Sequence, residues 1–550
     1  MQHDVLIVGG GAAGLVLAIE LGRRGVRAVV FEEDFDPPSF PKANNSTART
    51  MEHYRRLGFA DEIRMLGLPE DHPADVSYHT RFSNNEIARL HWASRREVMA
   101  KRTQYDPRWP TPEPLHRGQQ MLIEPVLKRH AGGWPSVELR FGWRVEAIAQ
   151  NAGGVQVTAR ELATGKTQTW AGRYAVGCDG PRSFVREAIG VGYAGQAAEE
   201  RDFLGGRMLA SYFRAPDFYD MVHGGRKSWM YWGFNTQRKG VATAIDGERF
   251  VIHTQLPRGT KGTLAYGRET LELVAGRPFP YEMIGVAEWT AGFTLVAERY
   301  RVGRILLAGD AAHLFTPTAG QGYNTSVDDV CNLGWKLAAV HEGWGGPRLL
   351  ASYSTERQPS GARIVNMTTE FFEGTTGVKG DFAQIDAETP EGESLRASIG
   401  RQLSEVTARE FRTLGLQLGY WYEDSPICVA DGTPPPPNDP HEYHSSARPG
   451  SRAPHVKLSD GSSIMDRFGP GFTLLCLSPV APDTGPMARA AAARKLPLDI
   501  VKLANDEMCA EVLRIYERNF VLVRPDGHVA WRADELPSDP VVVIDRVRGA

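Results

Sequence analysis

The chain has 550 residues, 42% of them hydrophobic and 23% charged, with a formal net charge of −3. This composition is that of an ordinary globular protein, and the length predicts two or three domains rather than a single core. The near-neutral charge gives no electrostatic reason to expect a nucleic acid or an anionic membrane as a partner. No apolar run of about 20 residues predicts a membrane span.

The five cysteines are scattered, with neither a CxxC pair nor the spacing of metal ligands. Free thiols in a reducing cytoplasm are therefore expected, and no metal site is predicted. The apolar N-terminus is not interpreted as a signal peptide, because it is rich in glycine and carries Glu20.

The first informative pattern lies at the N-terminus, where an apolar run over residues 4–8 predicts a buried strand. Three glycines follow at once, at Gly9, Gly11 and Gly14. In such a pattern the first glycine allows a tight turn, the second lets a phosphate approach the backbone, and the third lets a helix pack against the strand.

A helix is predicted from Ala13 to residue 25, with its N-terminal N–H groups directed at a pyrophosphate. A second strand, residues 28–31, ends at Glu32 and Glu33, where an acid can bind a ribose hydroxyl. Strand, glycines, helix, strand and acid in this order predict a dinucleotide-binding βαβ unit.

Two further glycine-bearing segments follow far along the chain. The middle one is Cys-Asp-Gly at residues 178–180, and the last follows an apolar strand and covers residues 309–313. A long helix is predicted over residues 326–341. Asp328 and Asp329 in its first turn are interpreted as complements of the helix dipole.

The composition changes between about residues 195 and 300, where aromatic residues become dense. Runs at 228–234 and 249–256 predict strands of a separate sheet, whose aromatic residues form either its core or the wall of a pocket for a planar ring. Residues 434–454 are rich in Pro, Ser and Gly and predict a linker. Short apolar runs beyond it predict a small α/β domain.

These segments, in this order, resemble the single-component FAD-dependent aromatic hydroxylases, the p-hydroxybenzoate and phenol hydroxylase group, over essentially the whole chain. The resemblance implies an α/β protein with a Rossmann-like FAD-binding domain of the glutathione-reductase type, an interleaved mixed-sheet substrate domain, and a C-terminal thioredoxin-like α/β domain without CxxC. The expected boundaries are 1–75, 100–190 and 295–375 for the FAD-binding domain, 76–99 and 191–294 for the substrate domain, 376–453 for a helical and Pro-rich connection, and 454–550 for the last domain.

By the same resemblance, FAD is the cofactor and NAD(P)H the co-substrate. The residues that it assigns to the cofactor, besides those of the N-terminal unit, are Lys42, Arg117, Gln120, Asp179, Gly309, Asp310, Pro317, Gly320, Gln321, Gly322, Tyr323 and Asn324. Asp310 is expected to bind the ribityl chain. Backbone N–H groups at 320–322 are expected at the pyrimidine edge, where reduced flavin carries negative charge.

Two positions depart from the family pattern. Lys42 stands where the family has arginine, which keeps the charge but loses the bidentate fork. Asn44 stands where some relatives have a substrate-facing histidine. Because an amide cannot act as a base, no residue is assigned to deprotonate a phenol.

The function implied by the resemblance is hydroxylation of a phenolic or polycyclic aromatic substrate with NAD(P)H and O2, through a flavin C4a-hydroperoxide. The candidate catalytic residues are Asn44, Arg226, Tyr231, His253 and Pro317. Baeyer–Villiger oxidation or other tailoring of a natural product on the same scaffold stays open, as does a homodimer. A non-enzymatic FAD-fold binding protein is the remaining alternative.

Overall fold

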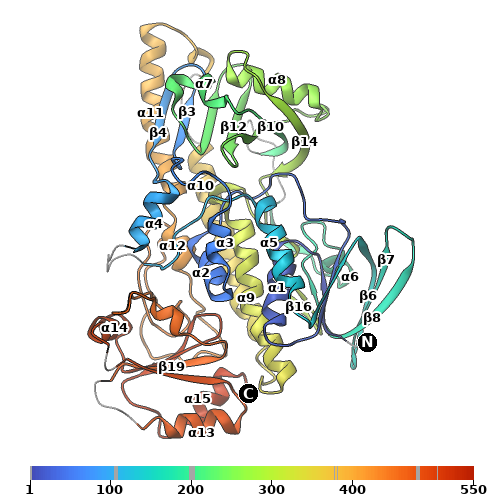
Figure 1. The fold of residues 1–550 in the computed structure, drawn as a ribbon, viewed down its shortest axis with the longest axis vertical. Helices are drawn as coiled ribbons and strands as arrows, with labels where there is room; N and C mark the ends of the chain where they lie inside the picture. The colour runs from blue at the N-terminus through green and yellow to red at the C-terminus, as the bar shows by residue number, and fades with distance from the viewer. Residues whose placement is uncertain are drawn as a thin grey trace.

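The computed structural model describes residues 3–103, 110–196, 205–376, 378, 380, 382–478, 483–503 and 506–550. Three parts follow one another along the longest axis, with the N-terminal sheet and its helices between a second sheet and the C-terminal part (Figure 1). Residues 104–109 of the predicted FAD-binding domain and 197–204 of the predicted substrate domain lie outside the described residues. No helix in the described ranges combines the length and the apolar character needed to cross a membrane.

The central part is built on an eight-stranded sheet. Its strands are β1 (His3–Val8), β2 (Ala28–Glu32), β5 (Val137–Phe141), β6 (Trp143–Asn151), β7 (Gly154–Glu161), β8 (Thr167–Gly177), β16 (Arg301–Val302) and β17 (Ile305–Leu307). The order β16-β17-β8-β1-β2-β5 is continuous, and β7 joins β8 to β6. The pairs of β1 with β2 and β8, of β2 with β5, and of β8 with β17 are parallel, as in a Rossmann-like sheet.

The helices of the central part enclose this sheet and continue toward the C-terminal part. They are α1 (Ala12–Gly22), α2 (Ala48–Leu57), α3 (Ala60–Arg64), α4 (Arg95–Thr103), α5 (Gln120–Gly132), α6 (Phe184–Ala188), α9 (Gln321–Glu342), α10 (Ala351–Thr376) and α12 (Leu414–Leu418). Helix α1 contacts α5 and α9, so it is completely buried. Helix α9 begins at Gln321 and not at Ser326, because left-handed Gly320 takes the N-cap place and no side-chain cap marks the start.

The second sheet has seven strands in the order β14-β10-β13-β12-β11-β3-β4. These are β3 (Val76–His79), β4 (Glu86–Leu90), β10 (Gly206–Arg214), β11 (Met230–Phe234), β12 (Lys239–Ala244), β13 (Arg249–Gln255) and β14 (Glu282–Ala291). Helix α8 (Leu264–Ala275) contacts β10, β11, β12 and β14, and α7 (Phe218–Met221) lies near the sheet. A small sheet of β9 (Tyr193–Gln196), β15 (Thr294–Ala297) and β18 (His313–Leu314) lies between the two larger ones in the chain.

The segment predicted as a connection contains a helix with a packing role. Helix α11 (Pro390–Phe411) contacts β4, and Ile399 and Leu403 are buried in the core of the second sheet. Farther on, the predicted linker is partly buried, with Arg452 only 1% exposed. The Pro-rich composition therefore correctly predicts irregular backbone, but this backbone is packed against its neighbours.

The C-terminal part is a four-stranded sheet in the order β20-β19-β21-β22. Its elements are β19 (Phe472–Cys476), α13 (Gly485–Ala493), β20 (Leu498–Lys502), α14 (Cys509–Tyr516), β21 (Phe520–Val523), β22 (Val529–Ala533) and α15 (Pro540–Val547). A parallel βαβ unit followed by a β-hairpin and a helix is the predicted thioredoxin-like arrangement. All five cysteines are free, and Cys476 is buried in β19.

Candidate active site

The three glycine-bearing segments meet at one edge of the central sheet. Strands β1, β8 and β17 are parallel neighbours, so the turns that follow them lie side by side. Gly9 has a φ of 106°, and a Cβ at this position would overlap the carbonyl oxygen of Cys178. A Cβ at Gly309 would lie 3.3 Å from the Cβ of Ala13. Side chains at either glycine would separate the segments.

The N-terminus of α1 and the end of β2 form the first wall of this site. Gly14 packs so closely that a Cβ would overlap the carbonyl oxygen of Gly9. The Glu32 carboxylate accepts the N–H of Gly10 at 2.6 Å. Glu33, in contrast, is exposed and pairs with Arg144 at 2.9 Å, so its predicted cofactor role is wrong.

Glu124 is a member of this wall that the sequence analysis missed. Its carboxylate accepts the N–H of Ala12 at 3.0 Å and the amide N–H of Gln120 at 2.6 Å. Glu124 is 1% exposed, and its second oxygen has no hydrogen-bond partner. Burial raises the pKa of the Glu124 carboxyl. The spacing of four residues between Gln120 and Glu124 on one helix face was the available signal.

The middle segment is held by its own carboxylate. Asp179 accepts the Ser183 hydroxyl at 2.5 Å and the Val185 N–H at 3.0 Å, so it fixes the start of α6. Burial raises the pKa of Asp179. Its side chain therefore shapes the turn beside Gly9, and its placement near a pyrophosphate stays a prediction.

Asp310 and Lys42 are opposite charges without direct partners. No described residue forms a hydrogen bond or ion pair with either side chain, although the charge of Lys42 acts on Asp310. The backbone oxygen of Asp310 accepts the Tyr193 hydroxyl at 2.6 Å. Asp310 is solvent-accessible, yet the surrounding protein raises the pKa of its carboxyl. Both charges are thus available to a ligand.

The segment before α9 has a strained, open backbone. Ala319 and Gly320 have φ values of 58° and 61°, and the Gln321 amide donates to the Ala319 carbonyl at 3.0 Å. Pro317 is exposed. A Cβ at Gly322 would meet no protein atom within 4 Å. Protein packing therefore does not require a glycine there, but a flat ligand lying against the backbone would.

Two residues assigned to the cofactor use their side chains within the protein. Tyr323 bonds to the hydroxyl of Tyr54. Asn324 accepts the N–H of Thr47 at 2.7 Å and donates to the Gly320 carbonyl at 2.7 Å. The predicted side-chain roles of Tyr323 and Asn324 toward a cofactor are therefore wrong, because these groups join α9 to α2.

Asn45 supports the same segment from the loop before α2, and the sequence analysis missed it. A Cβ at Gly320 would lie 2.5 Å from the Asn45 side-chain oxygen. Its neighbour Asn44 is half-buried, and no described residue forms a hydrogen bond with its side chain. The amide at 44 is therefore left for a ligand, and its role stays a prediction.

Asp329 has a different role from the one predicted. It lies in the interior of α9, is fully buried, and accepts the Gly309 N–H at 3.1 Å. It also contacts the His313 ring at 2.7 Å and the Arg357 guanidinium at 2.8 Å. Asp329 therefore anchors the last glycine-bearing segment, and it does not complement a helix dipole at the surface.

The second sheet presents one face to these segments. Cross-strand pairing aligns Trp232 with Val241, Val241 with His253, and His253 with Ala210. Tyr212, two residues after Ala210, lies on the same face and belongs to a cluster with Met121 of α5. The face that carries His253 and Trp232 is therefore turned toward the central part.

Family comparisons agree with this arrangement. A model described as "FAD binding domain" matches residues 2–368, and one described as "Aromatic-ring hydroxylase, C-terminal" matches residues 446–549. The chain belongs to the FAD-dependent aromatic-ring hydroxylases. Its enzymatic nature and its FAD cofactor are thereby confirmed, and the non-enzymatic alternative is dropped.

Individual relatives cover nearly the whole hydroxylase. The tetracenomycin B2 monooxygenase-dioxygenase of Streptomyces olivaceus is 31% identical over 100% of this chain and 98% of its own. The FAD-dependent monooxygenase apdD of Emericella nidulans is 31% identical over 97% of this chain and 88% of its own. A structure of chromopyrrolic acid-soaked RebC with bound 7-carboxy-K252c has a TM-score of 0.88 at 32% identity, covering 100% of this chain and 99% of the other.

The residues of the hydroxylase fit FAD. The helix N-terminus of α1 offers N–H groups to a pyrophosphate, and Glu32 stands where a ribose is expected. Asp310 offers unpaired acceptor oxygens for hydroxyl groups. The open backbone at Gly322 suits a planar ring.

Two predicted substrate residues of the hydroxylase are wrong. Tyr231 is aligned with Ala242, which lies on the opposite face from Trp232, and it is 0% exposed in the core. Successive strand residues alternate between faces, so its neighbour Trp232 has the orientation expected of Tyr231. Arg226 is exposed and pairs with Glu86 at 2.9 Å, at the other edge of the sheet.

His253 has the predicted orientation. Its ring lies 5.4 Å from that of Trp289, edge to face, and its Nδ1 has no hydrogen-bond partner. Burial lowers the pKa of His253 to about 4, so the ring is neutral at pH 7. A neutral ring can orient a hydroxyl group but is a poor base for a phenol.

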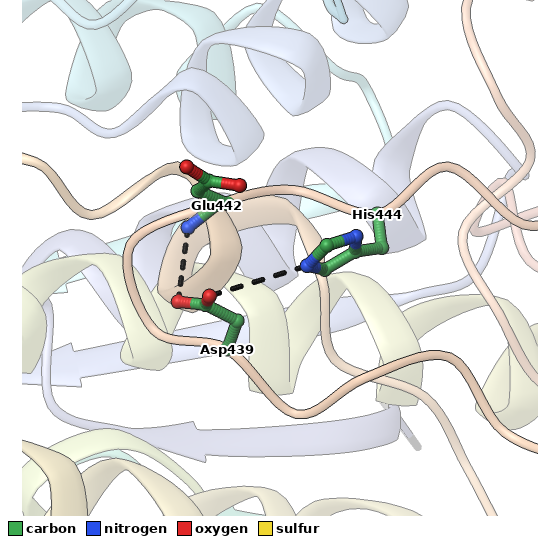
Figure 2. A group of neighbouring side chains, drawn as sticks. All are labelled: Asp439, Glu442 and His444. Atoms are coloured by element: carbon green, nitrogen blue, oxygen red, sulfur yellow. Dashed lines mark hydrogen bonds and ion pairs between the residues drawn. The ribbon is translucent and has the colours of Figure 1, made fainter.

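Among the described residues, Asp439, Glu442 and His444 form the one acidic and histidine group with metal-ligand spacing (Figure 2). One Asp439 oxygen already accepts the backbone N–H groups of His441 and Glu442, at 2.7 and 3.1 Å. This group is an ordinary turn stabilised by an aspartate.

Proposed function

We propose that the hydroxylase acts on a planar phenolic or polycyclic aromatic compound, with NAD(P)H as the source of electrons. The supporting observation is the sheet face with Trp232, His253 and Trp289, which is turned toward the Pro317–Gly320 segment. Aromatic rings around one partly polar ring form a suitable wall for a flat substrate. Relatives are described as an aklavinone hydroxylase and a phenol monooxygenase, and RebC is described with a carboxylated ligand.

When bound, FAD passes electrons from NAD(P)H to O2 and delivers one oxygen atom to the substrate ring. The protein's own contribution is to bind, orient and keep water away. The aromatic face excludes water beside the reacting ring, which strengthens the electrostatic interactions there. N–H groups at 320–322 stabilise negative charge at the adjoining edge of the ring system.

The decisive test is substrate-stimulated NAD(P)H oxidation by the FAD-loaded enzyme, scored with a panel of phenols and polycyclic phenols. We expect at least one of them to accelerate oxidation and to yield a product heavier by one oxygen atom from O2. If no aromatic compound accelerates oxidation or gains oxygen, the proposal is wrong. Oxygen insertion beside a ring carbonyl would identify Baeyer–Villiger chemistry.

The corrected register gives a second test. Trp289→Ala should raise KM for the active phenol about tenfold or more, because a large aromatic contact is lost. Tyr231→Phe alters the neighbouring strand but the opposite face, and should leave KM unchanged in protein with equal FAD content. Equal effects of the two substitutions would contradict the proposed pocket wall.

A further inference from the structure

Arg117 lies at the junction of the two large sheets and contacts aromatic rings of the substrate side. Its guanidinium carbon is 3.9 Å from the ring centroid of Trp229 and 5.9 Å from that of Phe411. Trp229 directly precedes β11, and Phe411 ends α11. The guanidinium is therefore fixed flat against a ring that belongs to the substrate domain.

The charge of Arg117 is not neutralised by a direct partner. No described residue forms a hydrogen bond or ion pair with this half-buried guanidinium. Burial lowers its pKa to about 9, and the charge of Glu410 opposes this only in part. An arginine that is desolvated without an acid is costly, whereas the same cation beside a bound anion is not.

Its surroundings include the segment that supports the reactive end of FAD. Glu410 accepts the Ala319 N–H at 3.3 Å, and its charge also acts on Arg117. The neighbouring His116 forms a bridge with Ser46, one residue after Asn45, which contacts Gly320. Arg117 thus lies near the Ala319–Gly320 turn and beside the substrate sheet.

We propose that Arg117 binds an anionic oxygen of the aromatic substrate, either a phenolate or a ring carboxylate, and thereby determines the substrate class. The inference rests on the proposed function, whose substrate is otherwise unspecified. The family resemblance assigned Arg117 to FAD, but the guanidinium is stacked on Trp229 of the substrate domain.

This assignment supplies what the site lacks chemically. Asn44 cannot accept a proton, and His253 is a weak base, because burial lowers its pKa to about 4. A fixed cation lowers the pKa of a nearby phenol and stabilises the phenolate without removing the proton itself. The proton then leaves to solvent. A carboxylate beside the reacting ring would use the same fork in a bidentate pair.

The test compares the FAD-loaded wild type with Arg117→Met, which keeps contact with Trp229 but removes the charge, and with Arg117→Lys. Arg214→Met is the matched control, because Arg214 is an exposed β10 residue paired with Glu248 at 2.7 Å. Binding is measured by flavin absorbance changes with naphthol, naphthoate and methoxynaphthalene. The first two probes offer the phenolate and the carboxylate, and the third offers neither.

We expect the wild type to prefer naphthol or naphthoate over methoxynaphthalene, and Arg117→Met to weaken that preferred probe about tenfold or more. Methoxynaphthalene binding, FAD content and FAD affinity should not change, and Arg117→Lys should be intermediate. The probe that loses affinity identifies the anion. The inference is overturned if the wild type shows no preference, if all three probes weaken equally, or if Arg117→Met loses FAD. Failure of every phenol to stimulate NAD(P)H oxidation would instead refute the proposed function.

Discussion

Two regions of the hydroxylase gather charged side chains, and they treat them in opposite ways. Where the C-terminal part meets α9 and α10, Glu356 accepts Lys336 at 2.5 Å and Arg524 at 2.6 Å. Arg524 also pairs with Asp526 at 2.6 Å, and all four side chains are buried. Each charge in this cluster, the C-terminal ion cluster, has a partner in the protein.

The active site has the reverse pattern. Asp310, Lys42 and Arg117 lie around the predicted cofactor and substrate, and no described residue pairs directly with any of them. Because a charge removed from water is costly unless it is paired, paired charges can support the fold, while unpaired ones are suited to a ligand. Charge pairing therefore separates structural from functional groups here.

The largest effect is expected from removing one member of the C-terminal ion cluster. Arg524→Met leaves Glu356 and Asp526 buried with fewer partners, and should lower the free energy of unfolding by about 3–5 kcal/mol. Urea unfolding monitored by tryptophan fluorescence measures this change. Arg514→Met is the matched control, since Arg514 is exposed and pairs only with Glu511 one helical turn away. A small effect of Arg524→Met would break the comparison.

Removing an unpaired charge should affect the ligand more than the fold. Asp310→Ala should weaken FAD binding about ten- to hundredfold, the range for a hydrogen bond to a charged group. Stability of the FAD-free protein should stay the same or rise, because an unpaired carboxylate is lost. Equilibrium dialysis and urea unfolding test the two halves. Normal FAD affinity with a large loss of stability would assign Asp310 to the fold.

The pH dependence of stability should separate the two regions, with a smaller effect. Burial alone would raise the pKa of Glu356, but Arg524 and Lys336 lower it to about 2. Its stabilising contribution is present above the unfolded value of about 4.3 and is lost as pH falls below it. Burial raises the pKa of Asp310, so its contribution has the opposite sign and is lost as pH rises through the folded pKa.

We therefore expect Asp310→Asn to reduce any gain in stability of the FAD-free protein between pH 7 and about pH 4. The steep loss of stability at lower pH, which comes from the C-terminal ion cluster, should be the same in both proteins. Urea midpoints across this pH range give the answer. A substitution that changed only the acidic limb would assign the wrong sign to Asp310.

Sequence patterns predicted local features well and partner choice poorly. The turn at Gly9 depends on a few neighbouring residues, so its glycine spacing was readable. Tyr231 was placed on the wrong face because β11 is buried on both sides, and its run of apolar residues lacks alternation. Asp329 was misassigned because the start of α9 is marked by backbone geometry at Gly320 and not by a capping side chain.

Arg117 illustrates the limit of such reading from the other direction. Its motif suggested a cofactor contact, while its ring partners Trp229 and Phe411 are far away in the sequence. Nothing in the local pattern indicates that a guanidinium will lack an acid. Whether a charge is paired depends on the tertiary fold, so the distinction between the two regions required the structure.

The smallest effect is expected at Lys42, where the comparison can be sharpened by adding capacity for pairing. Lys42→Arg restores the fork that the family has at this position, and a fork forms two directed bonds where an ammonium is a point charge. FAD affinity should rise about two- to fivefold if Lys42 faces the cofactor. Lys128→Arg is the control, because Lys128 pairs with the exposed Asp36 at 3.0 Å. Equal dissociation constants for both variants would mean that the unpaired cation at 42 serves the substrate or co-substrate, and would move it from the FAD half of the site to the other.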